Sequence, residues 1–447
     1  MSEEATLDEF SKTTVSQGRQ ETPVGELPAD WGIEWLKDVV EINPDGFSED
    51  DWPSETFEYI SLSEASEGEI EGSTTTPLEE APSRAQRTVQ RGDVLVGTVR
   101  PKQRSHGFVS EEHAGKICSS GFGVLRTESR LNSRYLLQEI LSNRFFSQME
   151  AYVAGSGYPA VKISDLKKHR VAIPPLPEQR KIATVLYTVD RAIEKTGEII
   201  GQVEQTKQAL TQSLFLDGYF DHRETVDAHH QNRLSRHPAE WQTKPAGEVM
   251  EVTRGAHPRP KSDDTLWRGE IPIVKIGDRN RGDSRTITST DDTVTEKGSK
   301  KSKLVDKGTL IVSNAGTVGT ARITGMQTCI HDHWLILRNY EESLSTRYLY
   351  YFINWNQEFL EALASGSTVL DLNTDDFRLF DITFPSLEEQ QKIADTLDSL
   401  HNREIINVEY SNRLKRLKHG LMQDLLSGTV RTTDTNIEVP DEIAQHG

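Results

Sequence analysis

The feature that most constrains this chain is a stretch that occurs twice. Residues 173–183 read IPPLPEQRKIA and residues 384–394 read FPSLEEQQKIA, which sets Glu178 and Glu389 211 positions apart. The same interval separates Cys118 from Cys329, so the repeat covers a whole structural unit. Two long copies are too few for a solenoid, and they predict a pseudo-twofold molecule.

The bulk properties favour two globular units joined by helices. A length of 447 residues allows about three domains, but the repeat takes precedence over that prior. The chain starts with an acidic segment, and no apolar run approaches the roughly 18 residues that a membrane helix needs. We therefore expect a cytoplasmic protein without a membrane segment. Cys118 and Cys329 occupy equivalent places in the two units, and we expect reduced thiols there.

The charge balance is opposite to that of most DNA-binding domains. The chain has 70 acidic and 51 basic residues, for a net charge of −19, whereas such domains are usually basic. Two explanations stay open. Either the partner is not nucleic acid, or the acidity adapts the solvated surface to a salty cytosol, with basic residues kept where they are needed.

Matching cues divide the chain. Pro-Ala-Asp-Trp begins at Pro28 and Pro-Ala-Glu-Trp at Pro238, each followed by short β-rich segments and then by a long helical pattern. We predict an α+β protein with two mixed, β-rich domains in pseudo-twofold repeat, separated by two long helices. The predicted parts are a mobile N-terminal arm (1–27), domain 1 (28–172), helix 1 (173–218), a linker (219–237), domain 2 (238–383), helix 2 (384–428) and a mobile C-terminal tail (429–447).

Both long helices carry a heptad repeat, which favours their pairing as a coiled coil. The bland alternative is two unrelated amphipathic helices that pack on separate domains. The seven-residue columns comprise Ile182, Val189, Thr196, Val203 and Leu210; Leu186, Ile193, Ile200, Lys207 and Leu214; and Ile393, Leu400, Asn407, Leu414 and Leu421.

No pattern typical of an enzyme stands out. The sequence has no glycine-rich dinucleotide fingerprint, no Walker-type loop and no nucleophile elbow. Cys329, His331 and His333 alternate as metal ligands can, but unit one has Cys118, Ser120 and Phe122 at those places. We predict no catalytic site, no metal and no bound cofactor.

Basic side chains gather in a few loops of this acidic chain. Arginine and lysine reach guanine edges or phosphates, and asparagine reads adenine. Each residue taken singly is more often a solvated cation, but the groups together favour double-stranded DNA as partner. The candidates are Arg84, Arg100, Lys102, Arg104 and Lys162 in unit one, and Arg254, His257, Arg259, Lys275, Arg279, Ser313 and Asn314 in unit two.

With these motifs in order and duplicated, the chain resembles the specificity (S) subunits of Type I restriction-modification systems over about residues 28–430. The most specific matches are the two helix entries at 174–183 and 385–394. Weaker ones are Gly92-Asp93-Val94-Leu95, Thr98-Val99-Arg100-Pro101, Ile163-Ser164-Asp165-Leu166 and Gly308-Thr309-Leu310-Ile311.

The resemblance implies a subunit without a catalytic site of its own. Each unit would be a target recognition domain followed by a conserved helix. The two helices would pair antiparallel as a spacer and dock two methyltransferase (M) subunits, through which the restriction/translocase (R) subunits join. S-adenosylmethionine and ATP would bind to those other subunits.

The same resemblance assigns residues of the two long helices to the spacer and docking region. They are Glu178, Gln179, Ile182, Leu186, Val189 and Ile193 in the first helix, and Glu389, Gln390, Ile393, Leu397, Leu400 and Leu414 in the second. Because Arg100-Pro101-Lys102 has no counterpart at 312–316, we expect the two halves of a bipartite DNA site to differ.

Two other readings remain. A self-sufficient restriction nuclease or methyltransferase would need its own motifs, and no Asn/Asp-Pro-Pro-Tyr/Phe sequence is present. A coiled-coil adaptor that does not touch DNA would keep its function after the loop cations were neutralised.

Overall fold

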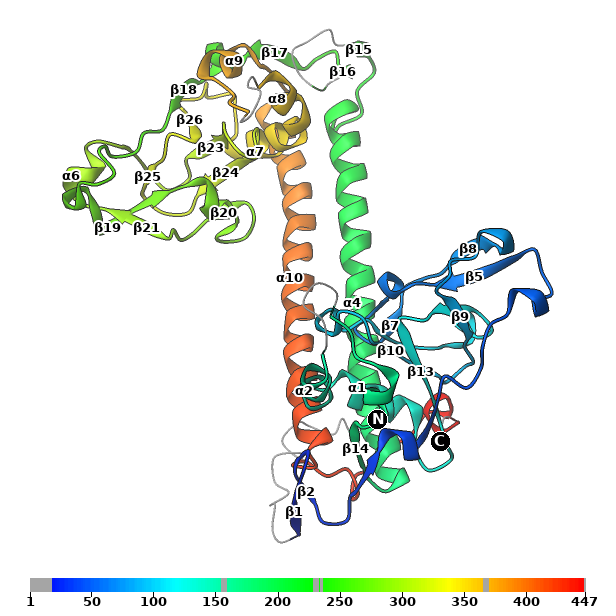
Figure 1. The fold of residues 1–447 in the computed structure, drawn as a ribbon. Coiled ribbons are helices and arrows are strands. Elements are labelled where there is room, and N and C mark those ends of the chain that lie inside the picture. The colour runs from blue at the N-terminus through cyan, green and yellow to red at the C-terminus, as the bar shows by residue number, and fades with distance from the viewer. Residues whose placement is uncertain (1–17, 154–158, 228–232, 234–235, 365–369, 446–447) are drawn as a thin grey trace. The chain divides into compact units, whose positions relative to one another are not determined.

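A computed structural model describes residues 18–153, 159–227, 233, 236–364 and 370–445 (Figure 1). The chain divides into two compact units. Unit 1 comprises Met1–Thr196 and Tyr410–Gly447, and unit 2 comprises Gly197–Glu409. Each unit therefore contains one β-rich domain, the start of one long helix and the end of the other.

Unit 1 is built on two four-stranded sheets. Val94, Leu95 and Val96 are all fully buried, as expected for a central strand that is covered on both faces. The first sheet has the order β11 (His106–Phe108), β10 (Val94–Gly97), β13 (Phe122–Thr127), β4 (Val40–Ile42), and the second the order β8 (Thr74–Pro77), β5 (Thr56–Ile60), β12 (Ile117–Ser119), β9 (Ala85–Thr88).

Two short helices cover the first sheet of unit 1. Asn132 and Ser142 cap α1 (Ser133–Leu141) and α2 (Asn143–Ala151), each side chain accepting a hydrogen bond from a backbone N–H of the first turn. After α3 (Ile163–Leu166), β14 (Arg170–Ile173) pairs with β3 (Gly32–Trp35) and leads into the long helix. The sheet, α1 and the start of that helix share one apolar core.

Unit 2 repeats this plan with different lengths. Its sheets have the orders β18 (Glu251–Arg254), β26 (Trp334–Arg338), β23 (Leu310–Ser313), β24 (Ala321–Thr324), β20 (Thr286–Ile287) and β21 (Asp292–Val294), β19 (Trp267–Val274), β25 (Thr328–Ile330), β22 (Lys303–Val305). The helices α7 (Thr346–Trp355) and α8 (Gln357–Leu363) correspond to α1 and α2, and β17 (Gln242–Pro245) pairs with β27 (Asp381–Phe384). In both units a parallel pair holds the cysteine strand, and Cys118 and Cys329 are buried, free thiols.

The long helices α4 (Leu176–Leu216) and α10 (Leu387–Leu426) pack against each other inside each unit. In unit 1 Ile182 and Leu186, near the start of α4, share a core with Leu425 at the end of α10. In unit 2 Leu214 near the end of α4 shares a core with Ile393. In each unit the start of one long helix packs against the end of the other, so the two helices are antiparallel. The predicted fold class, two β-rich domains with paired long helices, is confirmed.

Ion pairs accompany the apolar contacts of these helices. Lys418 Nζ lies 2.5 Å from Asp190 Oδ1 in unit 1, and Lys207 Nζ lies 2.8 Å from Glu404 Oε2 in unit 2. Lys207 occupies a heptad position, and its charge is paired across the helix interface. Among the described residues, no helix has the length and apolar character needed to cross a membrane.

Residues 429–445, which the sequence predicts as a mobile tail, pack on unit 1 in the structure. Ile443 of α11 (Asp441–Ala444) is fully buried, and its carbonyl accepts a 2.7 Å hydrogen bond from Asn132 Nδ2. Lys181 Nζ donates to the carbonyl of Thr435 at 2.8 Å. Apolar contacts, bonds to backbone carbonyls and the pairing of Arg431 with Glu178 hold the tail, and none of these leaves a periodic sequence pattern. Residues 446–447 lie outside the described chain.

Part of the predicted N-terminal arm is likewise paired in the structure. Residues 18–27 lead into the hairpin of β1 (Arg19–Thr22) and β2 (Gly25–Pro28). The Arg19 guanidinium donates to the carbonyls of Ser427 and Gly428, both at 3.3 Å, just beyond α10. Residues 1–17 lie outside the described chain.

Candidate nucleic-acid interface

In unit 1 the predicted DNA-contacting residues surround the turn after β10. Lys102, on the short helix η6 (Pro101–Gln103), has an 85% exposed side chain, and its nearest carboxylate, that of Glu150, is 3.9 Å away. Lys162 at the start of α3 is exposed, as are Arg84 and Arg100. Lys102 is thus a solvated cation that could meet a phosphate at little desolvation cost.

Arg104 is directed elsewhere. Its guanidinium donates to Asn143 Oδ1 at 2.7 Å and to the carbonyl of Leu141 at 3.4 Å, and it lies 4.5 Å from the centre of the Phe146 ring. These contacts join the η6 turn to α1 and α2. Although Arg104 is predicted as a DNA contact, the structure gives its side chain a role in packing.

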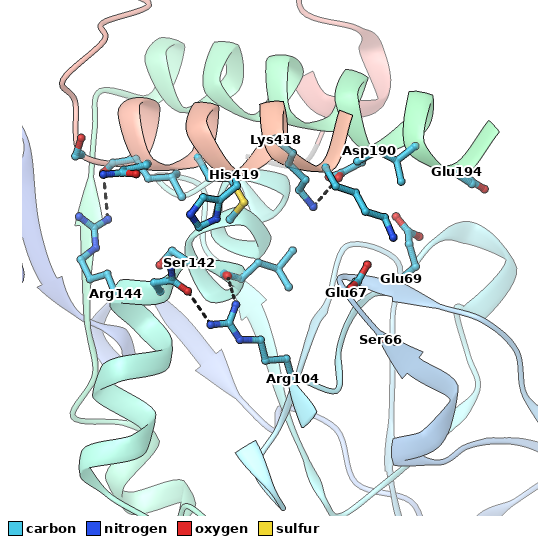
Figure 2. A pocket seen from close by; sticks show the side chains of 18 of the residues that line it. Ser66, Glu67, Glu69, Arg104, Ser142, Arg144, Asp190, Glu194, Lys418 and His419 are labelled. Carbon is cyan, nitrogen blue, oxygen red and sulfur yellow. Dashed lines mark hydrogen bonds and ion pairs between the residues drawn. The ribbon is translucent and has the colours of Figure 1, made fainter. Parts of the chain in front are cut away.

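Arg104 also borders a cavity of about 830 Å³ in unit 1 (Figure 2). Its walls carry charges of both signs, with more carboxylates than basic side chains. Lys418 is paired with Asp190 across the cavity wall, and Arg144 is paired with Glu139, which lies outside the lining. Burial raises the pKa of Glu69 above its ordinary value, with Arg134 opposing the shift. The cavity is therefore amphoteric, without a surplus of cations for a polyanion.

Among the predicted DNA-contacting residues of unit 2, Arg259 has a side chain that is 75% exposed. Two others are held by acidic partners. The Arg254 guanidinium grips Asp371 with bonds of 2.8 and 3.2 Å, and Lys275 Nζ donates to Asp292 at 2.6 Å while lying 5.2 Å from the Trp267 ring centre. Arg279 is half-buried. Arg259 is accordingly the most accessible of these four cations.

Ser313 and Asn314 are buried at the end of β23, although they are predicted to contact DNA. Ser313 Oγ accepts from the backbone N–H of Thr320 at 3.0 Å and donates to the carbonyl of Thr317. Asn314 Nδ2 donates to Asp371 Oδ1 at 3.1 Å. Both side chains hold the turn in shape, so they are not presented to solvent as base-reading groups would be.

His257, the remaining candidate, belongs to a cluster that the sequence did not reveal. Its Nδ1 lies 3.0 Å from Asp332 Oδ2, and the Nδ1 of His331 lies 2.8 Å from Asp332 Oδ1. The two imidazole rings are stacked at 4.6 Å between centres. Burial lowers the pKa of His331 to about 4, which leaves its ring neutral at pH 7. The sequence disfavours the alternating Cys329, His331 and His333 as metal ligands, and Cys329 packs in an apolar cluster with Ile273 and Val294.

The predicted helix residues Gln179 and Gln390 anchor each domain to its long helix. Gln179 Oε1 accepts from the backbone N–H of Asn132 at 2.8 Å, and its amide donates to the carbonyls of Arg130 and Pro174. Gln390 repeats this set with the backbone N–H of Ser345 at 2.9 Å and the carbonyls of Ser343 and Pro385. Both glutamines are fully buried. In the structure these two side chains therefore bind groups inside their own unit and are not exposed to a partner protein.

Glu178 and Glu389 are likewise buried, each at the start of a long helix, and each binds the segment that follows the other helix. Glu178 accepts from Trp31 Nε1 at 3.1 Å and from Arg431 in two bonds of 2.8 Å. Glu389 accepts from the backbone N–H of Tyr219 and from His222 Nε2, both at 2.8 Å. An acidic side chain in the first turn also complements the helix dipole.

The predicted apolar positions of the helices vary in burial. Ile182, Leu186, Ile393 and Leu397 are fully buried, and Leu414 is 9% exposed. Val189, Ile193 and Leu400 are half-buried. Burial is greatest where each helix lies against its own β-rich domain.

We compared the sequence with models of known protein families. The model for the Type I restriction modification DNA specificity domain matches residues 28–205 and again residues 238–416. The two matches cover most of the chain and follow its internal repeat. This chain belongs to that family. It is the DNA specificity subunit of a Type I restriction-modification complex, a subunit that is not catalytic.

Individual relatives agree with the family. A putative type I restriction enzyme MjaX specificity subunit of Methanocaldococcus jannaschii is 22% identical over 92% of this chain and 96% of its own. The type I restriction enzyme HindI specificity subunit of Haemophilus influenzae is 22% identical over 79% of this chain and 90% of its own.

Solved structures share the fold. A chain from a study of the complex assembly and conformational transition of the type I R-M system superposes with a TM-score of 0.55, at 24% identity over 90% of this chain and 99% of its own. The Type I restriction-modification S subunit of M. genitalium gives 0.54, at 14% identity over 88% and 96%.

Proposed function

We propose that this specificity subunit recognises a bipartite, asymmetric double-stranded DNA site, one half with each unit. We further propose that its helices dock two methyltransferase subunits, through which restriction subunits join. The observation that carries the proposal is a repeated frame with unlike loops. The glutamine anchors and strand pairings recur in both units, whereas the exposed cations sit on different segments.

The difference between the loops supports unlike half-sites. In unit 1 Lys102 extends from the turn between β10 and β11. In unit 2 the turn after β23 is closed by the buried Ser313 and Asn314, and the most accessible of the predicted cations, Arg259, comes from the segment after β18. Arginine pairs with a guanine edge or a phosphate in two bonds, while lysine acts as a point charge. Two readers with such different groups favour two different sequences.

Exposed apolar side chains on the helices support the docking of protein partners. In unit 1 α10 exposes Tyr410 at 52% and Leu417 at 41%, and these residues are seven apart on one helix face. In unit 2 Ile406 is 65% exposed. Aromatic and aliphatic groups left in solvent are typical of interaction sites. Because Glu178, Gln179, Glu389 and Gln390 face inward, we assign docking to these outward residues instead.

The cytoplasm is the compartment in which we expect this assembly to act. Cys118 and Cys329 are buried thiols without a disulfide, a state that a reducing compartment preserves.

The test is methylation mapping of DNA from cells that hold this chain with its methyltransferase partner, compared with cells that lack this chain alone. A split, asymmetric adenine-methylated motif that disappears on deletion would support the proposal. Replacing the domain of unit 2 by that of a relative should then change one half of the motif and leave the other. A motif that persists without this chain would overturn the proposal in favour of an adaptor.

A further inference from the structure

The cluster formed by His257, His331 and Asp332 in unit 2 has no part in the function derived so far. Its three side chains come from two segments, the one that follows β18 and the turn between β25 and β26. Two of them, His257 and Asp332, border a cavity of about 550 Å³ together with Arg259 and Lys301. We propose that His257, His331 and Asp332 bind one divalent transition-metal ion of the zinc type.

The spacing of the ligand atoms suits such an ion. One nitrogen or oxygen atom from each residue lies within 4.8 Å of the other two. A zinc ion at about 2.0–2.1 Å from its ligands sets them about 3.3 Å apart in a tetrahedron. His257 Nδ1 lies 3.0 Å from Asp332 Oδ2, and His331 Nδ1 lies 2.8 Å from the other carboxylate oxygen, Oδ1. Each separation needs to widen only slightly, and a carboxylate that binds the ion through both oxygens would serve both nitrogens.

Two atoms of the cluster lack the partners that buried polar atoms normally have. His331 Nδ1 and Asp332 Oδ1 are inaccessible to solvent and make no aligned hydrogen bond to any described residue, although they lie 2.8 Å apart. Buried polar atoms are bonded in the great majority of cases. An imidazole nitrogen and a carboxylate oxygen that lie this close, both without an aligned hydrogen bond, can donate two electron pairs to one cation.

The donor set indicates which cation. Two imidazoles and one carboxylate suit zinc and its neighbours, whereas magnesium and calcium prefer oxygen ligands throughout. His333 lies close by, with Nε2 4.0 Å from Asp332 Oδ1, and its side chain is 46% exposed. It could complete four protein ligands by a rotation. Otherwise the fourth position faces the cavity, where Arg259 and Lys301 favour a bound water or anion.

The ion would join two segments that carry exposed cations. Arg259 follows His257 by two residues, and its guanidinium lies 3.6 Å from Asp332 Oδ2. Metal bound at His257 and Asp332 would limit the motion of the Arg259 backbone. This consequence rests on the proposed function, in which Arg259 contacts DNA, whereas metal binding itself does not.

Metal binding is tested on the full chain after treatment with a chelator, by calorimetric titration with Zn²⁺ and by the visible absorption of added Co²⁺. We expect one equivalent to bind, and we expect His331→Gln and Asp332→Asn each to weaken binding by about 100-fold or more, since even the loss of a group behind a ligand costs about 10–100-fold. His113→Gln, which changes a buried histidine of unit 1, is the matched control and should bind as the natural chain does. Mg²⁺ should not compete.

The proposal is overturned if the natural chain binds no stoichiometric Zn²⁺, or if the His331 and Asp332 variants, shown by circular dichroism to be folded, bind it as tightly. DNA binding with and without metal is a separate readout. If Zn²⁺ binds and DNA affinity does not respond, the metal site stands and its link to Arg259 fails. If DNA does not bind under either condition, the proposed function fails and the metal site is unaffected.

Discussion

Units 1 and 2 have a buried glutamate at equivalent positions, at the start of a long helix, but a different basic side chain binds it in each unit. Glu178 is met by Arg431, which also binds Asp30 at 2.6 Å. Glu389 is met by His222, which also lies 3.1 Å from Glu240. An arginine keeps its charge at any pH at which proteins fold, while a histidine changes charge near neutrality. Duplication has conserved the acceptor and let the donor vary, so the two closures respond differently to pH.

A second contrast lies further along the helices, where Tyr187 in α4 and Asp398 in α10 are 211 positions apart. In unit 1 the Arg134 guanidinium lies 4.7 Å from the Tyr187 ring centre and 3.6 Å from that of Phe108. In unit 2 Asp398 accepts from Arg347, Arg285 and the Tyr351 hydroxyl. At this place one domain is held to its helix by a cation–π contact, and the other by ion pairs.

The largest effect should come from removing the buried acid in unit 1. Glu178 is 1% exposed, and Glu178→Ala would leave the Arg431 charge partly buried beside Asp30 alone. We expect a loss of about 3 kcal/mol in the free energy of unfolding of unit 1, as for other broken buried pairs. Hydrogen exchange read separately over the two units measures it.

Glu389→Ala is the matched change in unit 2, and it should cost less, about 2 kcal/mol, because His222 can release its proton when its partner is gone. Equal losses in the two units would contradict the distinction between the two cations.

Next in size is the helix contact. Asp398→Asn should cost unit 2 about 2 kcal/mol, since three donors lose a charged acceptor, and high salt should reduce this difference. Tyr187→Leu, which keeps apolar volume, should cost unit 1 about 1 kcal/mol, the usual size of a partly exposed cation–π contact. The measurement is urea unfolding at low and high salt. A salt-independent cost for Asp398→Asn would show that shape matters more than charge at this place.

For DNA, the comparison is between Lys102 and Arg259. Lys102→Ala should weaken binding by about 1 kcal/mol for any sequence and lower the slope of log affinity against log salt by about 1, as expected for a phosphate contact. Arg259→Ala should instead relax specificity at one position if the arginine reads a base.

Binding of labelled duplexes across a salt series separates these cases, and Lys392→Ala on α10 is the control cation. Unchanged affinity in both loop variants would place the DNA surface elsewhere in the units.

The smallest expected effect is a pH response confined to unit 2. Burial lowers the pKa of His222, but the hydrogen bond and charge of Glu389, and then Glu240, outweigh it, so the pKa is raised above 6.5. The stabilisation is therefore complete below the unfolded value of 6.5 and is lost as pH rises through the higher folded value. Hydrogen exchange across that range should show weakening of unit 2 only, and His222→Gln should abolish the trend. A parallel trend in unit 1, where Arg431 stays charged, would refute the assignment.

Much of the architecture was predictable because the chain contains two copies of one unit, and the two copies can be aligned with each other. The 211-residue offset marks both helix starts, and heptads mark the helix faces that are buried. These signals are local or periodic. They indicate which elements exist and which face of each is apolar, and the structure confirms that part.

The fate of single polar residues could not be predicted, because it depends on partners far away in the sequence. Arg104, Ser313 and Asn314 have the residue types that read DNA, yet Asn143, Thr320 and Asp371 engage them inside the fold. Arg431 lies 253 positions from Glu178. Likewise His257 joins His331 only because β18 pairs with β26. Such contacts between residues far apart in the sequence cannot be predicted from residue types alone.

The glutamine anchors have an evolutionary consequence. Gln179 and Gln390 grip their domains entirely through backbone groups, one amide N–H and two carbonyls in each case. Because these hydrogen bonds go only to backbone groups, the glutamine contact places few demands on the amino-acid sequence of the domain that it binds. Recombination between genes could therefore replace a whole recognition domain at this seam, provided that the new domain also satisfies Tyr187 or Asp398 of its helix. A lineage could then acquire a new DNA target in one step.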